Sequence, residues 1–140
     1  KEARWNMMMA STEGAMAFSK GLGAVHSMSH ALGANQELRL HHGTLNAVIL
    51  PSVLRFNKNH VENKYSRIAR AMGNKVTTDL ANEIEKLNEK IGMPSSLSEM
   101  GVTEDMIPKL VAHAATDPSN LTTPRLPSQE EWEKLFLECI

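Results

Sequence analysis

Residues 21–57 read GLGAVHSMSHALGANQELRLHHGTLNAVILPSVLRFN, and this stretch decides how the rest of the chain is interpreted. Its apolar residues recur at helical rather than alternating spacing. This predicts a helix over residues 24–32 that ends at Gly33, since glycine tolerates the left-handed φ of a helix end. After a polar loop, a second helix begins near His42. Pro51 should kink this helix or end its first half, because proline lacks the N–H of the helical hydrogen bond.

Helical spacing also recurs outside this stretch. Mostly apolar residues fall near one face of a predicted helix over residues 2–18, and two later helices that glycines close have apolar residues at intervals of four, three and four. These positions are Trp5, Met8, Met9, Thr12 and Met16 in the first helix, Val61, Tyr65, Ile68 and Met72 in the second, and Leu80, Ile84, Leu87 and Ile91 in the third. A further helix opens at Thr103, and Ser128 with Glu131 forms a capping box before the last one. Because period-two strand patterns are absent from the sequence, it predicts an all-α bundle of about seven helices.

The composition describes one globular domain and excludes several classes of partner. With 140 residues, 41% hydrophobic and 22% charged, the chain is long enough to bury a core. A net charge of −1 gives no electrostatic reason for binding nucleic acid or an anionic membrane, and no apolar run approaches the roughly 20 residues that span a bilayer. The single cysteine, Cys139, cannot form an internal disulfide, so we expect a cytoplasmic protein. Because the chain begins at Lys1 without an initiator Met, and a predicted helix follows at once, we expect it to be a piece of a longer protein.

Four of the six histidines lie in the quoted stretch. His26 and His30 are four residues apart on one predicted helix, so their side chains share a face with Cβ atoms roughly 6 Å apart. This spacing suits a shared metal ion or pocket, but ordinary core or surface histidines have it too, and both interpretations stay open. His42 begins the next helix, where the helix dipole keeps an imidazole neutral, the form that binds metal. Since adjacent residues point in different directions, we expect only one of His41 and His42 to reach the site.

Other chemistry-bearing patterns are weak. We expect His60 and His113 at solvated helix edges. No serine or cysteine lies in a strand–turn–helix elbow, and the glycines of GLG lack the strand and the remaining residues of a dinucleotide-binding loop. The nine methionines are interpreted as adaptable core residues. The residues alone therefore describe a helical domain that contributes two or three histidines to a candidate metal site.

Taken together, the motifs of the quoted stretch resemble those of the iron-containing (group III) alcohol dehydrogenases. The family pattern is G-x-G-x-x-H, a second histidine four residues later, L-G, a loop, H-G-x-x-N-A and L-P-x-V-x-x-F-N. Its positions here are Gly21, Gly23, His26, His30, Leu32, Gly33, His42, Gly43, Asn46, Ala47, Leu50, Pro51, Val53, Phe56 and Asn57. The segments KYSRIARAMG, IGMPSSLSEMGVTEDMIPKLVAHAATD and TTPRLPSQEEWEKLF are similar to later family segments, so the resemblance covers essentially the whole chain. It implies that residues 1–140 are the C-terminal, all-helical metal-binding and catalytic domain of a dehydroquinate-synthase-like fold, without its N-terminal nucleotide-binding domain.

The resemblance also implies roles for individual residues. The family's metal has one Asp and three His ligands, and the last two histidines match His26 and His42. The Asp and the first His belong to an upstream D-x-x-x-H helix that this chain does not contain. His30 is implied to lie near the nicotinamide and the substrate and to help proton transfer, and Phe18 to border the nicotinamide pocket. The choice of His42 over its neighbour rests on the following Gly43, because the loop before it is about two residues longer than in many relatives.

The activity that the resemblance implies is reversible hydride transfer between a small alcohol and NAD or NADP. Fe²⁺ or Zn²⁺ would act as a Lewis acid on the substrate oxygen, and the nicotinamide would carry the hydride. The implied partners are the missing nucleotide-binding domain and further copies in a homo-oligomer, and we expect this piece alone to be inactive. Two alternatives stay open: a maleylacetate reductase of the same fold, and a non-catalytic helical module that binds metal.

Overall fold

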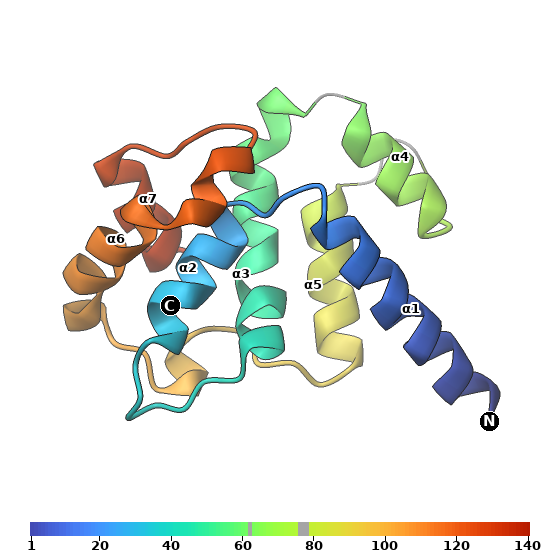
Figure 1. The fold of residues 1–140 in the computed structure, drawn as a ribbon, viewed down its shortest axis with the longest axis horizontal. Coiled ribbons are helices and arrows are strands. Elements are labelled where there is room, and N and C mark those ends of the chain that lie inside the picture. Colours follow the sequence, from blue (N-terminus) through green and yellow to red (C-terminus); the bar gives the residue numbers. More distant parts are fainter. Residues whose placement is uncertain (62, 76–78) are drawn as a thin grey trace.

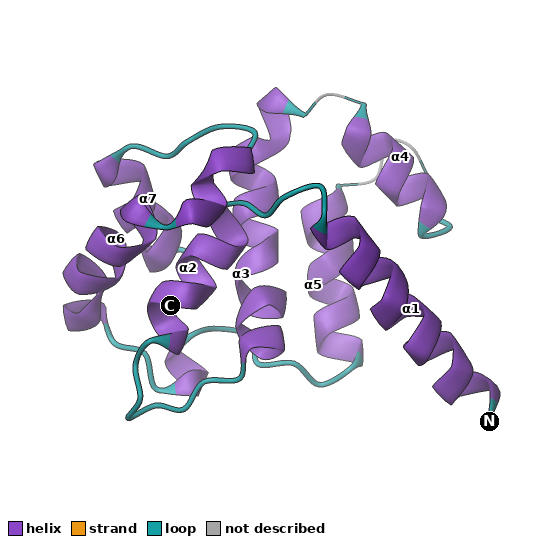
Figure 2. Ribbon diagram, viewed as in Figure 1, coloured by secondary structure: helices purple, strands orange, loops and turns teal. Residues whose placement is uncertain are grey.

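The structure, a computed structural model, describes residues 1–61, 63–75 and 79–140. Over these ranges the chain is helical and has no strand, as Figure 1 and Figure 2 show. The α-helices are α1 (Glu2–Phe18), α2 (Ala24–Gly33), α3 (His42–Asn57), α4 (Lys64–Ala71), α5 (Leu80–Lys90), α6 (Ile107–Thr116) and α7 (Gln129–Leu137). Four 3₁₀ helices lie between them: η1 (Lys58–His60), η2 (Ser98–Met100), η3 (Glu104–Met106) and η4 (Pro118–Thr122). The predicted all-α fold is therefore confirmed. No helix of the described residues is long and apolar enough to cross a membrane.

The core lies around α2 and α3, which run side by side in the centre of the molecule (Figure 1). α6 packs on α2 and α7 packs on α6, while α5 packs on α3. The large side chains that these helices and the segment before η2 bury almost completely are Met28, Leu32, Leu45, Ile49, Leu97, Val111, Trp132 and Phe136. Burial of each such side chain contributes roughly 1.5–3 kcal/mol. This packing fixes the N-terminal end of α3 beside α2.

Local signals set the helix ends. Ser128 Oγ accepts the Glu131 N–H at 3.2 Å, and the Glu131 carboxylate accepts the Ser128 N–H at 2.9 Å, so the predicted capping box is confirmed. α3, in contrast, continues through Pro51, so the alternative that Pro51 ends this helix is wrong. Buried Leu45 and Val53 hold the two halves of α3 against the core, and their burial offsets the cost of an internal proline, about 3 kcal/mol.

The first helix has the predicted bounds, but it contributes nothing to the core. None of the α1 side chains is buried: Trp5 is 63% exposed and Met16 is 71% exposed. In Figure 1, α1 runs away from the central helices toward the N-terminus. The interpretation of the methionines as core residues therefore holds for Met28 and is wrong for Met7, Met8, Met9 and Met16 of α1. The expected exposure of His60 and His113 is confirmed.

Candidate metal centre

Three histidine rings meet between α2 and the first turn of α3. His26 and His30 lie one helical turn apart on α2, with ring centres 5.8 Å from each other. The His42 ring centre is 5.2 Å from that of His26 and 5.5 Å from that of His30. His26 and His30 are half-buried, as expected, while His42 is exposed. The structure thus brings the three predicted histidines together between α2 and the first turn of α3.

His41 and His42 are adjacent in sequence, but only His42 joins the other two rings. His41 is the N-cap of α3, and its Nδ1 accepts the N–H of Thr44 at 3.3 Å. That contact keeps the His41 ring along the start of its own helix. His42 is the first residue of the helix, and its ring lies against α2 with Nδ1 3.4 Å from Ser29 Oγ.

The hydrogen bonds of His42 select one tautomer of its ring. Asn46 lies one turn further along α3 and donates from Nδ2 to His42 Nε2 at 3.1 Å. Nε2 therefore carries the lone pair, and Nδ1–H points to Ser29 Oγ, which itself donates to the His26 carbonyl oxygen at 3.1 Å. The amide oxygen of Asn46, Oδ1, is buried without a hydrogen-bond partner in the described chain. A lone pair on Nε2 is what a metal ion or an external donor would need from His42.

Both candidate ligands favour the neutral imidazole. Burial lowers the pKa of His26, and the neighbouring His42 and His30 lower it further, against an opposing effect of Asp117. Burial and the nearby His30 and His41 also lower the pKa of His42. Because neutral imidazole binds metal ions, these shifts suit ligation at neutral pH.

Asp117 is the polar neighbour of the cluster that sequence reasoning missed. Its Oδ2 lies 3.0 Å from His30 Nδ1, and its Oδ1 accepts the Ser119 N–H at 2.8 Å. Burial alone would raise the pKa of Asp117, but the hydrogen bonds from Ser119 and His30 outweigh it and lower that pKa. The order Asp-Pro-Ser is a local signal for a capped turn. Nothing in the sequence, however, connects this turn to a histidine 87 residues earlier.

The loop between α1 and α2 places Phe18 at the edge of the cluster. The Phe18 ring is 6.3 Å from that of His26 in an edge-to-face arrangement, and the side chain is 58% exposed. Gly21 adopts a φ of +100°, and a Cβ there would lie 2.3–2.5 Å from the side chain of Thr122. Thr122 Oγ1 in turn donates to the Leu22 carbonyl oxygen at 2.5 Å. Only glycine permits this close approach, which holds the loop beside His26.

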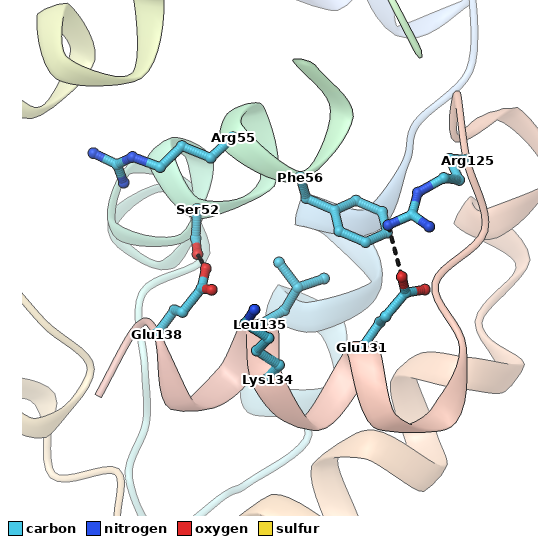
Figure 3. Close-up of a pocket in the computed structure, with 8 residues that line it drawn as sticks. All are labelled: Ser52, Arg55, Phe56, Arg125, Glu131, Lys134, Leu135 and Glu138. Atoms are coloured by element: carbon cyan, nitrogen blue, oxygen red, sulfur yellow. Dashed lines mark hydrogen bonds and ion pairs between the residues drawn. The ribbon is translucent and has the colours of Figure 1, made fainter. Parts of the chain in front are cut away.

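Several cavities lie along α3 in the described part of the chain, and one of them adjoins the histidines. A mostly apolar cavity of about 650 Å³ lies between α2, α3 and α4, and His26 and Asn46 line it. Figure 3 shows a second cavity, of about 460 Å³ between α3 and α7, where Arg125 lies over the Phe56 ring at 3.9 Å and pairs with Glu131 at 2.8 Å. This second cavity contains no histidine. Its ion pair ties the connection before α7 to α7 itself, and the contact of Arg125 with the Phe56 ring ties that connection to α3, so both contacts have a structural role.

The geometry fits two ligands of a metal ion rather than a complete set. Two imidazoles that share a tetrahedral ion at metal–nitrogen distances of roughly 2.0–2.1 Å have ring centres about 5 Å apart. The His26 and His42 rings are 5.2 Å apart. Among the residues that the structure describes, however, no group of three or more His, Cys, Asp or Glu side chains is arranged to hold a metal ion. The described residues can therefore supply part of a ligand set.

Comparisons with known proteins point to one family. A model described as "Fe-containing alcohol dehydrogenase family, C-terminal" matches residues 1–140. The 4-hydroxybutyrate dehydrogenase of Cupriavidus necator is 44% identical over an alignment of 143 residues, which covers 97% of this chain and 37% of that protein. The NADPH-dependent butanol dehydrogenase of Clostridium saccharobutylicum is 34% identical, with 100% of this chain and 38% of that protein covered.

The fold is similar to that of a solved relative. A crystal structure of 1,3-propanediol oxidoreductase matches with a TM-score of 0.79 and 31% sequence identity, over 85% of this chain and 33% of that one. The chain thus spans a little over a third of the length of the two curated relatives.

Proposed function

The chain belongs to the Fe-containing alcohol dehydrogenase family, and we propose that the protein containing it is a metal-dependent, NAD(P)-linked alcohol dehydrogenase. The reaction is the reversible oxidation of an alcohol to an aldehyde or ketone. One observation carries the proposal: the His26 and His42 rings converge at 5.2 Å from two helices, while His41 is engaged as a helix cap. The names of the two relatives, both dehydrogenases, support the reaction class.

His26 and His42 would hold the metal ion, with Nε2 as the donor nitrogen of His42, and the ion would replace the hydrogen bond that Asn46 Nδ2 donates to this nitrogen. The remaining ligands, an Asp and a His, would come from a part of the protein that this chain does not contain. Imidazole and carboxylate suit both Fe²⁺ and Zn²⁺. A bound divalent ion supplies Lewis acidity toward the oxygen of the substrate.

The other two side chains of the cluster would have different roles: His30 would exchange a proton with the substrate, and Phe18 would help to position the nicotinamide. His30 lies one turn from His26 and faces His42, so its Nε2 can pass a proton to or from a substrate held beside these rings. Phe18, which borders His26 with an exposed ring, would form one wall of the nicotinamide pocket. A bound nicotinamide would supply the hydride acceptor or donor of the reaction.

We further propose that α1 is covered in the whole protein. Its exposed side chains include Trp5, Met7, Met8 and Met16, and a large exposed apolar surface marks an interface. The nucleotide-binding domain or a second subunit of a homo-oligomer can supply that cover. The nucleotide-binding site itself would lie outside this chain, because GLG has neither a strand before it nor the rest of a dinucleotide-binding loop.

A turnover assay of the full-length protein tests the proposal. The assay follows oxidation of 4-hydroxybutyrate, butanol and 1,3-propanediol with NAD⁺ and with NADP⁺, before and after metal removal by a chelator. We expect turnover that disappears with the metal and returns with Fe²⁺ or Zn²⁺. The identity to a 4-hydroxybutyrate dehydrogenase favours that hydroxy acid as the best substrate of the three. Turnover that survives complete metal removal, or none with any alcohol and either cofactor, would contradict the proposal.

A further inference from the structure

Asp117 reaches the histidine cluster from near the other end of the chain. It follows α6 directly, and its Oδ2 lies 3.0 Å from His30 Nδ1. The Asp117 side chain is only 7% exposed, whereas that of His30 is 39% exposed. The contact therefore joins a buried carboxylate to the inner nitrogen of a histidine whose remaining ring edge is open.

The carboxylate is held in place by contacts of its own. Asp117 Oδ1 accepts the Ser119 N–H at 2.8 Å, and this bond caps η4. Asn120, in the same turn, accepts a hydrogen bond from Ser27 Oγ of α2 at 2.7 Å and donates to the Ala114 carbonyl oxygen of α6 at 2.8 Å. The turn is thus fixed to both helices, so Oδ2 is a stationary acceptor.

A stationary carboxylate determines which nitrogen of His30 carries the proton. An ionised carboxylate only accepts hydrogen bonds, so Nδ1 of His30 must donate to it. In the neutral ring the lone pair then lies on Nε2, and the bond to Asp117 also limits rotation of the ring. The His30 ring is stacked on that of His42 at an interplanar angle of 17°, an orientation that the Asp117 contact helps to hold.

We propose that Asp117 is a positioning residue that fixes the ring orientation and the Nδ1–H tautomer of His30. This rests on the proposed function, in which Nε2 of His30 exchanges a proton with the substrate. Asp117 itself touches neither of the two candidate ligands by a hydrogen bond or ion pair that the structure records. Its effect passes through His30.

Two substitutions separate positioning from the capping role of the same side chain. Asp117→Asn keeps an oxygen to cap η4, but its amide N–H₂ group can only donate to His30 Nδ1. The lone pair must then move to Nδ1 and the proton to Nε2. Asp117→Ser also retains a good N-cap, but its side chain is too short to reach His30. If Asp117 were only a cap, both variants would behave like the wild type.

The experiment uses the full-length protein with ¹⁵N-labelled histidine rings. Ring ¹⁵N shifts of the metal-free protein report the His30 tautomer, and His30→Gln assigns the signal. We expect Nδ1–H in the wild type, Nε2–H in Asp117→Asn, and a mixture in Asp117→Ser. In the metal-loaded enzyme, kcat should fall about 10- to 100-fold in both variants, with metal content unchanged and KM within about twofold. Asp105→Asn alters an exposed aspartate of η3 and is the matched control. It should change neither the His30 tautomer nor kcat.

The outcomes separate this inference from the proposed function. A wild-type tautomer and kcat in Asp117→Asn would overturn the positioning role. Loss of metal from the Asp117 variants would overturn it too, because His30 would then act as a ligand. If the wild-type enzyme oxidised no alcohol, the proposed function would fail, while the tautomer shifts of the metal-free protein would still decide whether Asp117 positions His30.

Discussion

Helices α1 and α3 are almost equally long, 17 and 16 residues, and both carry large apolar side chains, yet α3 buries seven residues and α1 buries none. The difference lies in where the apolar groups fall. In α3, Leu45, Val48, Ile49 and Val53 form a stripe that meets the core. In α1, Met7, Met8 and Met9 are consecutive, and consecutive residues lie about 100° apart around a helix. A helix that is apolar on several sides is normally enclosed by a larger structure.

The histidine cluster depends on the packed helices and not on α1. His26, His30 and His42 all lie on α2 and α3, whose contact is part of the core. Only Phe18, the last residue of α1, approaches the cluster. A change in the core should therefore disturb both stability and site, whereas a change in α1 should leave the fold of residues 1–140 intact.

The largest expected effect on stability comes from Trp132, and Trp5 provides the comparison. Trp132 is 1% exposed and Trp5 is 63% exposed. Trp132→Ala should lower the free energy of unfolding by about 3–5 kcal/mol, and Trp5→Ala should change it by less than about 0.5 kcal/mol. Urea unfolding of residues 1–140, followed by circular dichroism, measures both. A loss above about 1 kcal/mol for Trp5→Ala would show that α1 packs against the rest of this chain after all.

A smaller effect concerns thiol reactivity. Burial raises the pKa of Cys139 to about 11, well above that of an ordinary thiol at about 8.5, so the folded protein forms at least about 100-fold less thiolate at pH 8. A disulfide reagent at pH 8 should therefore label folded Cys139 at least about 100-fold more slowly than the unfolded chain. The control is Ser11→Cys in a Cys139→Ala background, since Ser11 lies on exposed α1 and its thiol should react at an ordinary rate. Equal rates for the two thiols would show that Cys139 is not enclosed.

The same pKa shift gives a pH dependence. The folded pKa of Cys139 lies above the unfolded one, so the neutral thiol favours the folded state below about pH 9. That advantage is lost as the pH rises through about 11. Stability of residues 1–140 should fall over this range more in the wild type than in Cys139→Ala. Parallel pH profiles would contradict the assigned burial of the thiol.

The smallest expected effect distinguishes a capped helix from an uncapped one. Asp79 caps α5 by accepting the N–H groups of Ala81 and Asn82, whereas Lys1 makes no side-chain cap for α1. Asp79→Ala should lower the free energy of unfolding by about 1 kcal/mol, and Lys1→Ala should leave it almost unchanged.

The cap also gives a pH dependence. Hydrogen bonds from the Asn82 and Ala81 N–H groups and contact with Lys58 lower the pKa of Asp79, against an opposing effect of burial. Its contribution is therefore present above the unfolded pKa, about 3.9, and is lost as the pH falls through the folded one.

Asp79→Asn is the matched control for the capping prediction. It keeps a good N-cap but cannot titrate. Urea unfolding at pH 7 and at pH 3 should therefore show a pH-dependent difference between wild type and Asp79→Asn. An Asp79→Ala variant as stable as the wild type at pH 7 would refute the contribution of the cap.

Predictions from the sequence were most accurate where they rest on neighbouring residues. The bounds of α1, the start of α3 at His42 and the capping box at Ser128 follow from spacing and capping residues, and all three are confirmed. The sequence left open whether α3 continues through Pro51. Proline disfavours a helix interior, but the burial of both halves of α3 outweighs this local preference. The exposure of α1 could not be predicted either, since spacing identifies a helix but does not say what covers it.

For the site, the sequence indicated which histidines could meet but not what holds them. The i, i+4 spacing of His26 and His30 predicts a shared face, and the structure places both rings there. The bond between Asp117 and His30 arises only when α6 and η4 fold against α2, so no spacing rule could reveal it. The same holds for Ser29 and Asn46, whose contacts with His42 depend on the packing of α2 on α3 and on the first turn of α3.

Metal content of three histidine variants tests the central claim most directly. The full-length protein is purified as His26→Ala, His42→Ala and His41→Ala, loaded with Fe²⁺ or Zn²⁺, dialysed, and analysed for bound metal per chain. We predict that His26→Ala and His42→Ala lose the metal, because each removes a candidate ligand from the pair whose ring centres are 5.2 Å apart. His41→Ala should retain it, because His41 only caps α3. Retention of metal by His42→Ala together with its loss from His41→Ala would contradict the assignment of the site.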